Sequence, residues 1–305
     1  MKKIIVTGAA GYIGYHLTKA LSDQGYCVYA VVRPGSINNI RIQGLPGVIL
    51  IEADIKTLKV EDLPADIKCN IECIYHLAWM EANRYDYREQ MEGAFISIRI
   101  LELAPKLGCK RFVGIGSQAE YGLTMEIMNE DETKPNPFCG YGASKVAACY
   151  LTRRMASELG IEWVWGRIFS VYGQYEPVTR LIPSLIRSYR LEEEIRLSSC
   201  RQCWDFLYSE DAARAIIAIG ERGINGNIYN IANGEYKPLK EFVICLKKLL
   251  GSKSSIFFGD DPNPFVSLQP SVTKITRDTG WLPLISFEEG IRKMMIGISD
   301  EKGIS

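Results

Sequence analysis

Residues 4–14 read IIVTGAAGYIG: an apolar run passes directly into three glycines spaced three residues apart. The run Ile4–Thr7 has the composition of a buried strand, and Tyr12–Gln24 after it has an amphipathic helical pattern. Glycines at a strand–helix junction allow a tight turn and close approach of a pyrophosphate, to which the helix N-terminus offers amide donors. The spacing differs by one residue from the usual dinucleotide fingerprint, but its place at the first junction favours a cofactor loop over a plain turn. The loop residues expected to contact a dinucleotide are Gly8, Gly11, Tyr12, Ile13 and Gly14.

Short apolar runs rich in Val and Ile then alternate with longer segments of helical period. The further strands expected are Cys27–Val32, Val48–Glu52, Ile74–Ala78, Arg111–Gly116 and Glu162–Phe169. The helices expected between them are Asp86–Leu107 and Tyr141–Leu159, with a shorter one near Val60–Leu63. Continuous apolar strands that alternate with helices are typical of a parallel sheet covered on both faces. Residues 1–173 therefore predict a doubly wound α/β domain of the Rossmann type.

After residue 173 the rhythm changes. The helical segments expected here are Arg180–Leu191, Asp211–Glu221 and Lys240–Leu250. The segment Ser252–Ser271 is rich in Pro, Gly and Ser, which indicates a long surface loop, and the last few residues are expected to fray. With 305 residues the chain is long enough for two domains. We expect residues 174–305 to form mostly a smaller, partly interleaved α/β substrate domain, with a segment near 205–221 that returns to the first domain.

Composition excludes several classes of partner. The chain carries 36 Lys+Arg and 36 Asp+Glu, and its 47% hydrophobic and 24% charged residues are ordinary for a globular protein and argue against disorder. Zero net charge removes the broad field that attracts nucleic acid or an anionic membrane. No run approaches the roughly 18 apolar residues that span a bilayer. We therefore expect neither a nucleic-acid partner nor a membrane partner.

The nine cysteines are scattered and odd in number, which favours free thiols in a reducing compartment. Cys200-x-x-Cys203 is the one pair with metal-like spacing, and neither histidine of the chain lies near it in sequence, so no metal site is expected. The start of the chain, with two lysines before an apolar run, resembles a signal peptide. It continues through glycines into a helix without a convincing cleavage region, and we expect a cytoplasmic protein.

The end of the second expected strand bears on the choice of cofactor. An acidic residue about twenty positions beyond the glycines would bind the ribose hydroxyls of NAD, but the strand ends Val31-Val32-Arg33-Pro34. A carboxylate there would repel the 2′-phosphate of NADP, whereas the Arg33 guanidinium can hold it with paired donors. The sequence favours NADP over NAD. A plain solvated arginine at a strand end remains the alternative.

Two further motifs carry chemistry. Tyr141-Gly-Ala-Ser-Lys145 opens an expected helix, and a spacing of four puts Tyr141 and Lys145 on one helical face. An ordinary Tyr has a pKa of about 10, and a neighbouring ammonium that stabilises the phenolate is expected to lower it into a working range. Ser117 follows the fifth strand, where the carboxyl ends of a doubly wound sheet border the ligand crevice. Its hydroxyl is expected to bond a reacting substrate oxygen, the alternative being a serine that caps a turn.

At this point the chain resembles, over nearly its whole length, the extended short-chain dehydrogenase/reductases, and among them the NAD(P)-dependent nucleotide-sugar epimerase/dehydratase group. The motifs that carry the resemblance are TGAAGYIG at 7–14, His76-Leu77-Ala78, Ser117 with Tyr121-Gly122, Tyr141-x-x-x-Lys145, Arg167-x-x-x-Val171-Tyr172-Gly173, Asp205-Phe206 with Asp211, Tyr229-Asn230-Ile231-Ala232 and Gly280-Trp281-x-Pro283. Their combination is specific for the family and much less specific for the reaction.

The resemblance implies that Tyr141 is the general acid/base, that Lys145 binds the nicotinamide ribose and lowers the pKa of Tyr141, and that Ser117 holds the sugar oxygen at the reacting carbon. The further cofactor contacts that it implies are Asp54 and Ile55 at the adenine and the backbone of Leu77 and Ala78 along the cofactor channel. The C-terminal part would grip the nucleotide diphosphate. The helices near 86–107 and 141–159 commonly build a four-helix bundle in this family, which implies a homodimer.

Departures from the family pattern narrow the reaction. The family's 4,6-dehydratases place Asp-Glu directly after the catalytic hydroxyl residue, whereas this chain has Gln118 and Ala119, with Glu120 one position too far on. We therefore do not expect a dehydratase. Members of the family have an arginine before the Asp-Phe pair, where this chain has Trp204. They often have asparagines at the positions of Gln90 and Ser170. The acidic residue that binds ribose in the NAD-dependent epimerases aligns near Val32. Arginines that could replace the missing one are Arg180, Arg187, Arg201 and Arg277, and the expected substrate contacts are Gln118, Ser170, Arg180, Arg201, Trp204 and Arg277.

The function favoured by these residues is NADPH-dependent reduction of a nucleotide-linked 4-keto-6-deoxyhexose. The stretch GSQAEYG at 116–122 also resembles that of 4-ketoreductases in deoxysugar branches such as CDP-abequose synthesis. A UDP-sugar 4-epimerase with retained NAD needs the same Ser117, Tyr141 and Lys145, so it remains the alternative. A non-catalytic NADP-binding sensor is more remote, because such a protein has no need of the Tyr–Lys pair.

Overall fold

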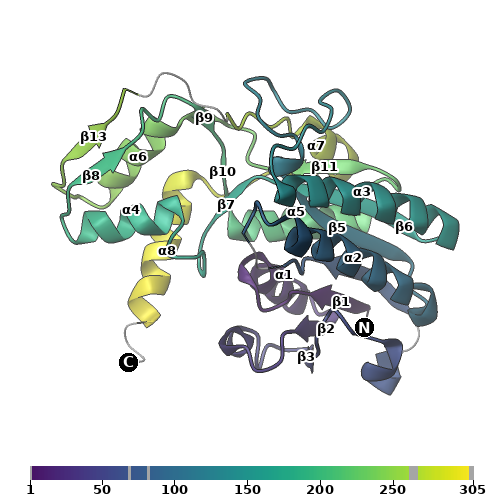
Figure 1. Cartoon of the computed structure of the whole chain (residues 1–305). Coiled ribbons are helices and arrows are strands. Elements are labelled where there is room, and N and C mark those ends of the chain that lie inside the picture. The colour runs from purple at the N-terminus through teal and green to yellow at the C-terminus, as the bar shows by residue number, and fades with distance from the viewer. Residues whose placement is uncertain (1, 68–69, 81–82, 261–266, 302–305) are drawn as a thin grey trace.

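The centre of the molecule is a parallel sheet in the order β11-β6-β5-β4-β1-β2-β3 (Figure 1). The computed structural model describes residues 2–67, 70–80, 83–260 and 267–301. The strands of this sheet are β1 (Lys3–Thr7), β2 (Cys27–Val32), β3 (Val48–Glu52), β4 (Ile71–His76), β5 (Arg111–Ser117), β6 (Glu162–Ile168) and β11 (Ile228–Ile231). All neighbouring pairs are parallel. The predicted doubly wound α/β fold is therefore confirmed.

Helices cover both faces of this sheet. In β1, Ile4 and Val6 join the core cluster that contains residues of α1 (Tyr12–Asp23) and α5 (Ser209–Arg222). Ile5, between them, joins the opposite cluster with residues of α2 (Tyr87–Leu103) and α3 (Gly140–Leu159). Successive strand side chains point to opposite faces, and here both faces are buried. This double burial explains why the strands are apolar without interruption.

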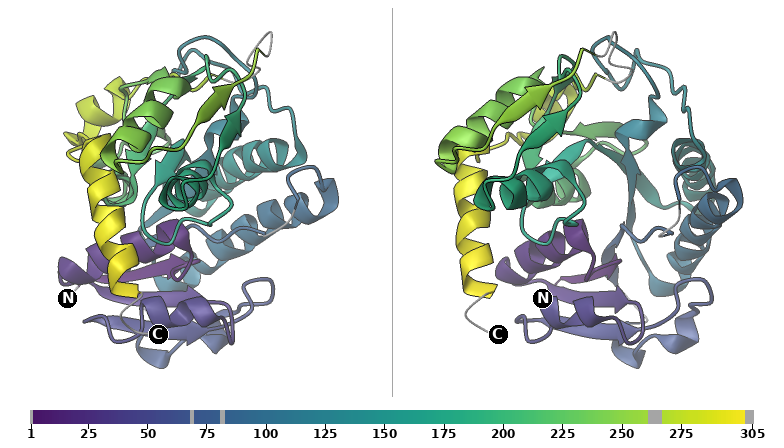
Figure 2. Two further views of the ribbon diagram at one scale, coloured as in Figure 1. Left: turned by 90° about the vertical axis from the view of Figure 1, so that its left-hand side faces the viewer. Right: turned by 60° about the vertical axis from the view of Figure 1, so that its left-hand side comes forward.

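The C-terminal part adds a third apolar cluster beside the sheet, and Figures 1 and 2 show its elements gathered on one side. Its helices are α4 (Leu181–Arg190), α6 (Leu239–Leu249) and α8 (Phe287–Glu301), and α7 (Thr273–Thr279) packs against α5 and β11. Three small sheets pair β7 (Ser170–Tyr172) with β10 (Phe206–Tyr208), β9 (Cys203–Trp204) with β12 (Lys237–Pro238), and β8 (Ile195–Leu197) with β13 (Ile256–Phe258). None of the described helices is long and apolar enough to cross a membrane.

Several predicted boundaries need correction. The fourth strand begins at Ile71 rather than Ile74 and ends at His76, because the chain then turns across the glycine loop. The segment near Val60 is a single 3₁₀ turn, Val60–Asp62. The predicted loop Ser252–Ser271 contains β13, whose apolar residues pair with β8 about sixty residues earlier in the chain. Its residues 261–266, and the predicted fraying at 302–305, lie outside the described residues.

The part after residue 173 returns to the sheet twice. Helix α5 packs on α1, as the predicted return near 205–221 requires, and β11 then pairs with β6 at the sheet edge. Two buried polar side chains hold these crossings. Asp205 accepts hydrogen bonds from the backbone amides of Asn233 (2.9 Å) and Gly234 (2.6 Å), and Asn230 accepts one from the Tyr121 hydroxyl (2.8 Å). The division at residue 173 remains a prediction.

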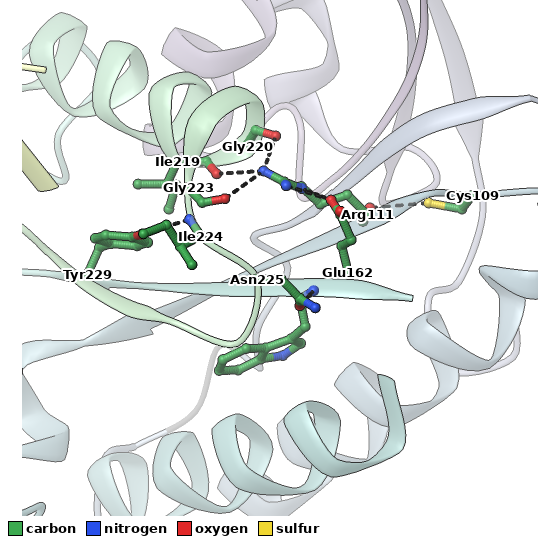
Figure 3. Close-up of polar contacts among 10 residues, drawn as sticks. Cys109, Arg111, Glu162, Ile219, Gly220, Gly223, Ile224, Asn225 and Tyr229 are labelled. Carbon is green, nitrogen blue, oxygen red and sulfur yellow. Dashed lines mark hydrogen bonds and ion pairs between the residues drawn. The ribbon is translucent and has the colours of Figure 1, made fainter. Parts of the chain in front are cut away.

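Arg111 joins the start of β5 to the C-terminal end of α5 (Figure 3). Its Nη1 donates to the carbonyl oxygens of Gly220 (3.1 Å) and Gly223 (3.0 Å), with a longer contact to that of Ile219 (3.4 Å). Its Nε (2.8 Å) and Nη2 (2.5 Å) donate to Glu162. The last carbonyls of a helix have no partners within it, and a cation there also interacts favourably with the helix dipole. Arg111 therefore supplies α5 with its C-terminal cap.

Replacing Arg111 by Leu is expected to lower the free energy of unfolding by about 2 kcal/mol, because the α5 carbonyls lose charged donors. Urea denaturation measures the change. The matched control is Lys110→Met, which removes an exposed ion pair with Glu72 and is expected to cost less than about 1 kcal/mol. Equal losses in the two variants would contradict the assigned role of Arg111.

Candidate active site

The glycine loop has the geometry that its spacing predicts. Gly8 has a φ of +70°, and a Cβ at this position would lie 2.9 Å from the amide nitrogen of Ala78. The Gly8 amide donates to the carbonyl of Val31, and Leu77 and Ala78 donate to Thr7, so the loop is fixed between two strand ends. Helix α1 has Gly11 as its N-cap, with no side-chain cap and no acidic residue in its first turn. Its first amides thus remain available to an anion, and the pyrophosphate of a dinucleotide fits there.

The ends of β2 and β3 form the neighbouring part of the crevice. Arg33 is exposed at the end of β2, and its carbonyl accepts a hydrogen bond from the Asn39 amide group (3.0 Å). Asp54 is exposed and accepts from the Lys56 amide, whereas Ile55 is half-buried. A residue that sequence reasoning missed is Arg41, whose Nη1 reaches the carbonyl of Ala10 in the glycine loop (3.4 Å). The signal in the sequence was a second arginine eight residues after Arg33.

Lys145 lies buried beneath the end of β5. Its Nζ donates to the carbonyl of Ile115 (2.7 Å), and burial lowers its pKa to about 7 against the opposing field of Glu120. Tyr141 opens the same helix, where its amide donates to the carbonyl of Arg84 (2.8 Å). The structure therefore brings Tyr141 and Lys145 to the carboxyl end of the sheet, beside Ser117.

The pKa of Tyr141 moves in the direction opposite to the prediction. Burial raises it, and a hydrogen bond with Ser117 opposes that rise. The Lys145 Nζ lies 5.9 Å from the centroid of the Tyr141 ring. It is not among the principal causes of the shift, so desolvation outweighs its attraction for a phenolate. The buried phenol is protonated at neutral pH.

Ser117 caps a turn, which was the alternative role, and its bond to a substrate oxygen stays a prediction. Its hydroxyl oxygen accepts a hydrogen bond from the Ala119 amide (3.2 Å) and so caps the 3₁₀ turn Gln118–Glu120. The same hydroxyl reaches the Tyr141 phenol. A hydroxyl can accept and donate at once, so the cap leaves the Ser117 proton available to a second acceptor.

Glu120 faces the interior of the protein. Its Oε1 accepts hydrogen bonds from the Ser117 amide (3.0 Å) and the Trp165 indole (3.0 Å), and its Oε2 pairs with Nε of Arg167 (2.8 Å). The side chains of Glu120 and Arg167 are 0% and 1% exposed. Both oxygens of this carboxylate are therefore engaged inside the protein.

The predicted substrate residues lie on different elements. Gln118 lies in the turn after β5, Ser170 on β7 and Trp204 on β9, and all three are half-buried. Arg201 is exposed just before β9. Arg180 is the exposed N-cap of α4, and its charge acts on Tyr141. Arg277 lies on α7, where its Nε pairs with Asp278 (2.7 Å). Of the arginines proposed to grip a diphosphate, Arg180 therefore has the electrostatic connection to the site.

Two buried polar groups near Arg180 were not predicted as substrate contacts. Burial raises the pKa of Glu176 to about 8, against the field of Arg180. Within the described part of the chain, one Glu176 carboxylate oxygen and the Tyr12 hydroxyl are buried without a hydrogen-bond partner. Buried polar groups are normally paired, so both are candidates to meet a ligand. The described residues contain no group of three or more His, Cys, Asp or Glu side chains that could hold a metal ion.

A pyrophosphate loop joined to a Ser–Tyr–Lys site at the carboxyl ends of a parallel sheet defines a dinucleotide-dependent enzyme of the short-chain dehydrogenase/reductase type. The chain belongs to the NAD dependent epimerase/dehydratase family, whose model matches residues 4–232.

Relatives by sequence catalyse different reactions of this family. CDP-abequose synthase of Salmonella muenchen is 28% identical over 310 residues, which cover 96% of this chain and 97% of that protein. A dTDP-glucose 4,6-dehydratase of Neisseria meningitidis serogroup B is 27% identical over 342 residues, which cover 99% and 94%. Among solved structures, a UDP-glucuronic acid 4-epimerase variant from Bacillus cereus, in complex with UDP-4-deoxy-4-fluoro-glucuronic acid and NAD, has a TM-score of 0.85. It is 23% identical and covers 98% of this chain and 99% of its own, which supports the fold.

Replacing Gly8 by Ala is expected to weaken dinucleotide binding by at least about tenfold, or 1.4 kcal/mol, because the new Cβ would push the loop away from Ala78. Quenching of protein fluorescence on titration with NADPH measures the affinity.

The matched control is Gly25→Ala. Gly25 also has a positive φ, +77°, but nothing lies within 4 Å of a Cβ there. Backbone strain should destabilise both variants by about 1 kcal/mol, whereas only Gly8→Ala should lose affinity for NADPH. Equal affinities would show that the loop does not form the cofactor site.

Proposed function

We propose that this protein uses NADPH to reduce C4 of a nucleotide-linked 4-keto-6-deoxyhexose. The observation that carries the proposal is the pairing of Glu120, the carboxylate that follows β5, with Arg167. The two positions that follow Ser117 hold Gln118 and Ala119, and Glu120 is paired with Arg167 inside the protein. The site thus retains the groups for hydride and proton transfer to a carbonyl without a free acid for elimination of water. The likeness to CDP-abequose synthase supports the same reading.

The protein groups act on the carbonyl oxygen. NADPH, when bound, would supply the hydride for C4. Tyr141 donates its phenolic proton to the carbonyl oxygen as the carbonyl becomes an alcohol, and burial keeps that phenol protonated at neutral pH. Ser117 bonds the same oxygen, and charged Lys145 stabilises the phenolate left on Tyr141 until solvent returns a proton.

Cofactor choice is the second part of the proposal. Arg33 follows β2 and Arg41 reaches the glycine loop, which supports a place for both beside a bound dinucleotide. Guanidinium groups hold a 2′-phosphate better than a diol. The further cofactor contacts proposed are Gly8, Gly11, Tyr12, Ile13, Gly14, Asp54, Ile55, Leu77 and Ala78. The substrate contacts proposed are Gln118, Ser170, Arg180, Arg201, Trp204 and Arg277.

A homodimer through a four-helix bundle is the third part. Helices α2 and α3 pack side by side on one face of the sheet (Figure 1). Tyr87, Met91 and Phe95 follow one another at a spacing of four on α2, and Tyr150 and Leu151 lie on α3, all of them exposed. A spacing of four aligns the α2 side chains into one apolar stripe, and the same two helices of a second copy would cover it.

Addition of a CDP- or dTDP-linked 4-keto-6-deoxyhexose is expected to cause loss of NADPH absorbance. Tyr141→Phe is expected to lower the rate by about 10²–10⁴-fold, because it removes the positioned proton donor. Its thermal unfolding should stay unchanged. NADH in a parallel assay is expected to react more slowly.

The matched control is Tyr26→Phe, which removes a hydroxyl that bonds the Glu221 side chain at the surface and should keep the full rate. An epimerase would instead retain bound NAD and show no net change in absorbance. Absence of NADPH consumption with either nucleotide sugar in the folded protein would count against the reductase.

A further inference from the structure

Trp79 follows the cofactor-channel residues Leu77 and Ala78 and is clamped by α2. Its indole Nε1–H donates to Oε1 of Gln90 (2.8 Å), and Gln90 is itself 1% exposed. A Cβ on Gly93, one helical turn further along α2, would lie 2.6 Å from the indole ring. The hydrogen bond and the absent side chain together fix the plane of the ring.

The clamped ring contacts both reacting side chains. The Lys145 Nζ lies 3.7 Å from the centroid of the Trp79 ring. The Tyr141 ring meets the indole edge to face, with centroids 6.2 Å apart and planes at 89°. A cation over an indole face is attracted by the negative charge of that face, and the attraction is strongest where water is excluded. Lys145 thus has two fixed partners, the Trp79 ring and the carbonyl of Ile115.

Few other charges face Lys145. Glu120 from the turn after β5 favours the ammonium, but it is already neutralised by Arg167. His76 from β4 is buried, and both burial and the charge of Lys145 lower its pKa, to about 3, so it is neutral. Tyr141, on the same helix as Lys145, is protonated. The indole face and the Ile115 carbonyl therefore act together with Glu120 against the desolvation of Lys145.

We propose that Trp79 is a positioning residue that keeps Lys145 charged and aimed at Tyr141, and that Gln90 sets the plane of the indole for this purpose. The proposal rests on the proposed function, in which charged Lys145 stabilises the Tyr141 phenolate. It explains why a glutamine stands at position 90, where an asparagine, shorter by one methylene, would not span the same distance to the indole. Loss of the ring should neutralise Lys145 at lower pH and remove that stabilisation.

The test is the titration of Lys145 in the full chain with ¹³C-labelled lysine, followed by the NMR shift of Cε and assigned with Lys145→Met. Trp79→Leu keeps the site apolar but removes the ring face, and the pKa of Lys145 is expected to fall by about one unit. Trp79→Phe keeps a ring face, and the fall should be clearly smaller. Gln90→Leu keeps the indole but removes the hydrogen bond that fixes its plane, and a smaller fall in the pKa of Lys145 is expected. This variant also tests the proposal if Trp79→Leu does not fold.

The relative falls in the pKa of Lys145 among these variants decide the proposal. A merely structural role predicts the same Lys145 titration in Trp79→Leu and Trp79→Phe, and an equal shift, a rise or no change would overturn the inference. This NMR readout needs no substrate, so it holds even if the proposed reduction fails. Where NADPH consumption is observed, the alkaline limb of its pH profile should move down in Trp79→Leu by the same amount as the Lys145 titration.

Discussion

The buried ion pair between Glu120 and Arg167 is the interaction on which the arrangement of the site depends. It joins the turn after β5 to β6, and the same carboxylate also bonds the Ser117 amide and the Trp165 indole. A buried charge is tolerated only when it is paired and its remaining lone pairs are satisfied. Breaking such a pair by removal of one partner typically costs about 3–5 kcal/mol. The turn that carries Ser117 is therefore fixed by side chains behind it.

The same pair also limits the chemistry. Glu120 is a carboxylate close in sequence to Ser117, yet its bonds to the Ser117 amide and to Arg167 hold it inside the protein. The neighbours of the Ser117 hydroxyl are the neutral Gln118 and the Tyr141 phenol, both half-buried. Lys145 lies under this group, held by the carbonyl of Ile115 and by the Trp79 ring. The proposed proton transfer from Tyr141 depends on this arrangement.

Local patterns in the sequence predict the sheet and much of the site. The strand–glycine loop–helix unit and the strands β1 to β6 follow from apolar runs and helical period, because both faces of the sheet are buried. Ser117, Tyr141 and Lys145 follow from their places at the ends of elements. The strands β7 to β13 could not be predicted, because each has only two to four residues and its partner lies far along the chain. Their pairing is set by tertiary contacts rather than by propensity.

The missed parts of the site have the same cause. Glu120 meets Arg167 forty-seven residues later, and Trp79 meets Lys145 across two elements. No spacing rule connects such residues. The rise in the pKa of Tyr141 is a result of burial, which a sequence motif does not report, whereas the attraction of a nearby lysine is what the motif suggested. Sequence thus indicates the candidate groups, and packing decides their protonation.

Reduction at C4 can be measured directly with NADPH that carries deuterium at C4 of its nicotinamide. Incubation of the protein with this cofactor and a nucleotide-linked 4-keto-6-deoxyhexose should yield a product with one deuterium at C4 of the sugar and a stoichiometric amount of NADP. A sugar product without deuterium, or an epimerised sugar formed with no net oxidation of the cofactor, would contradict the account.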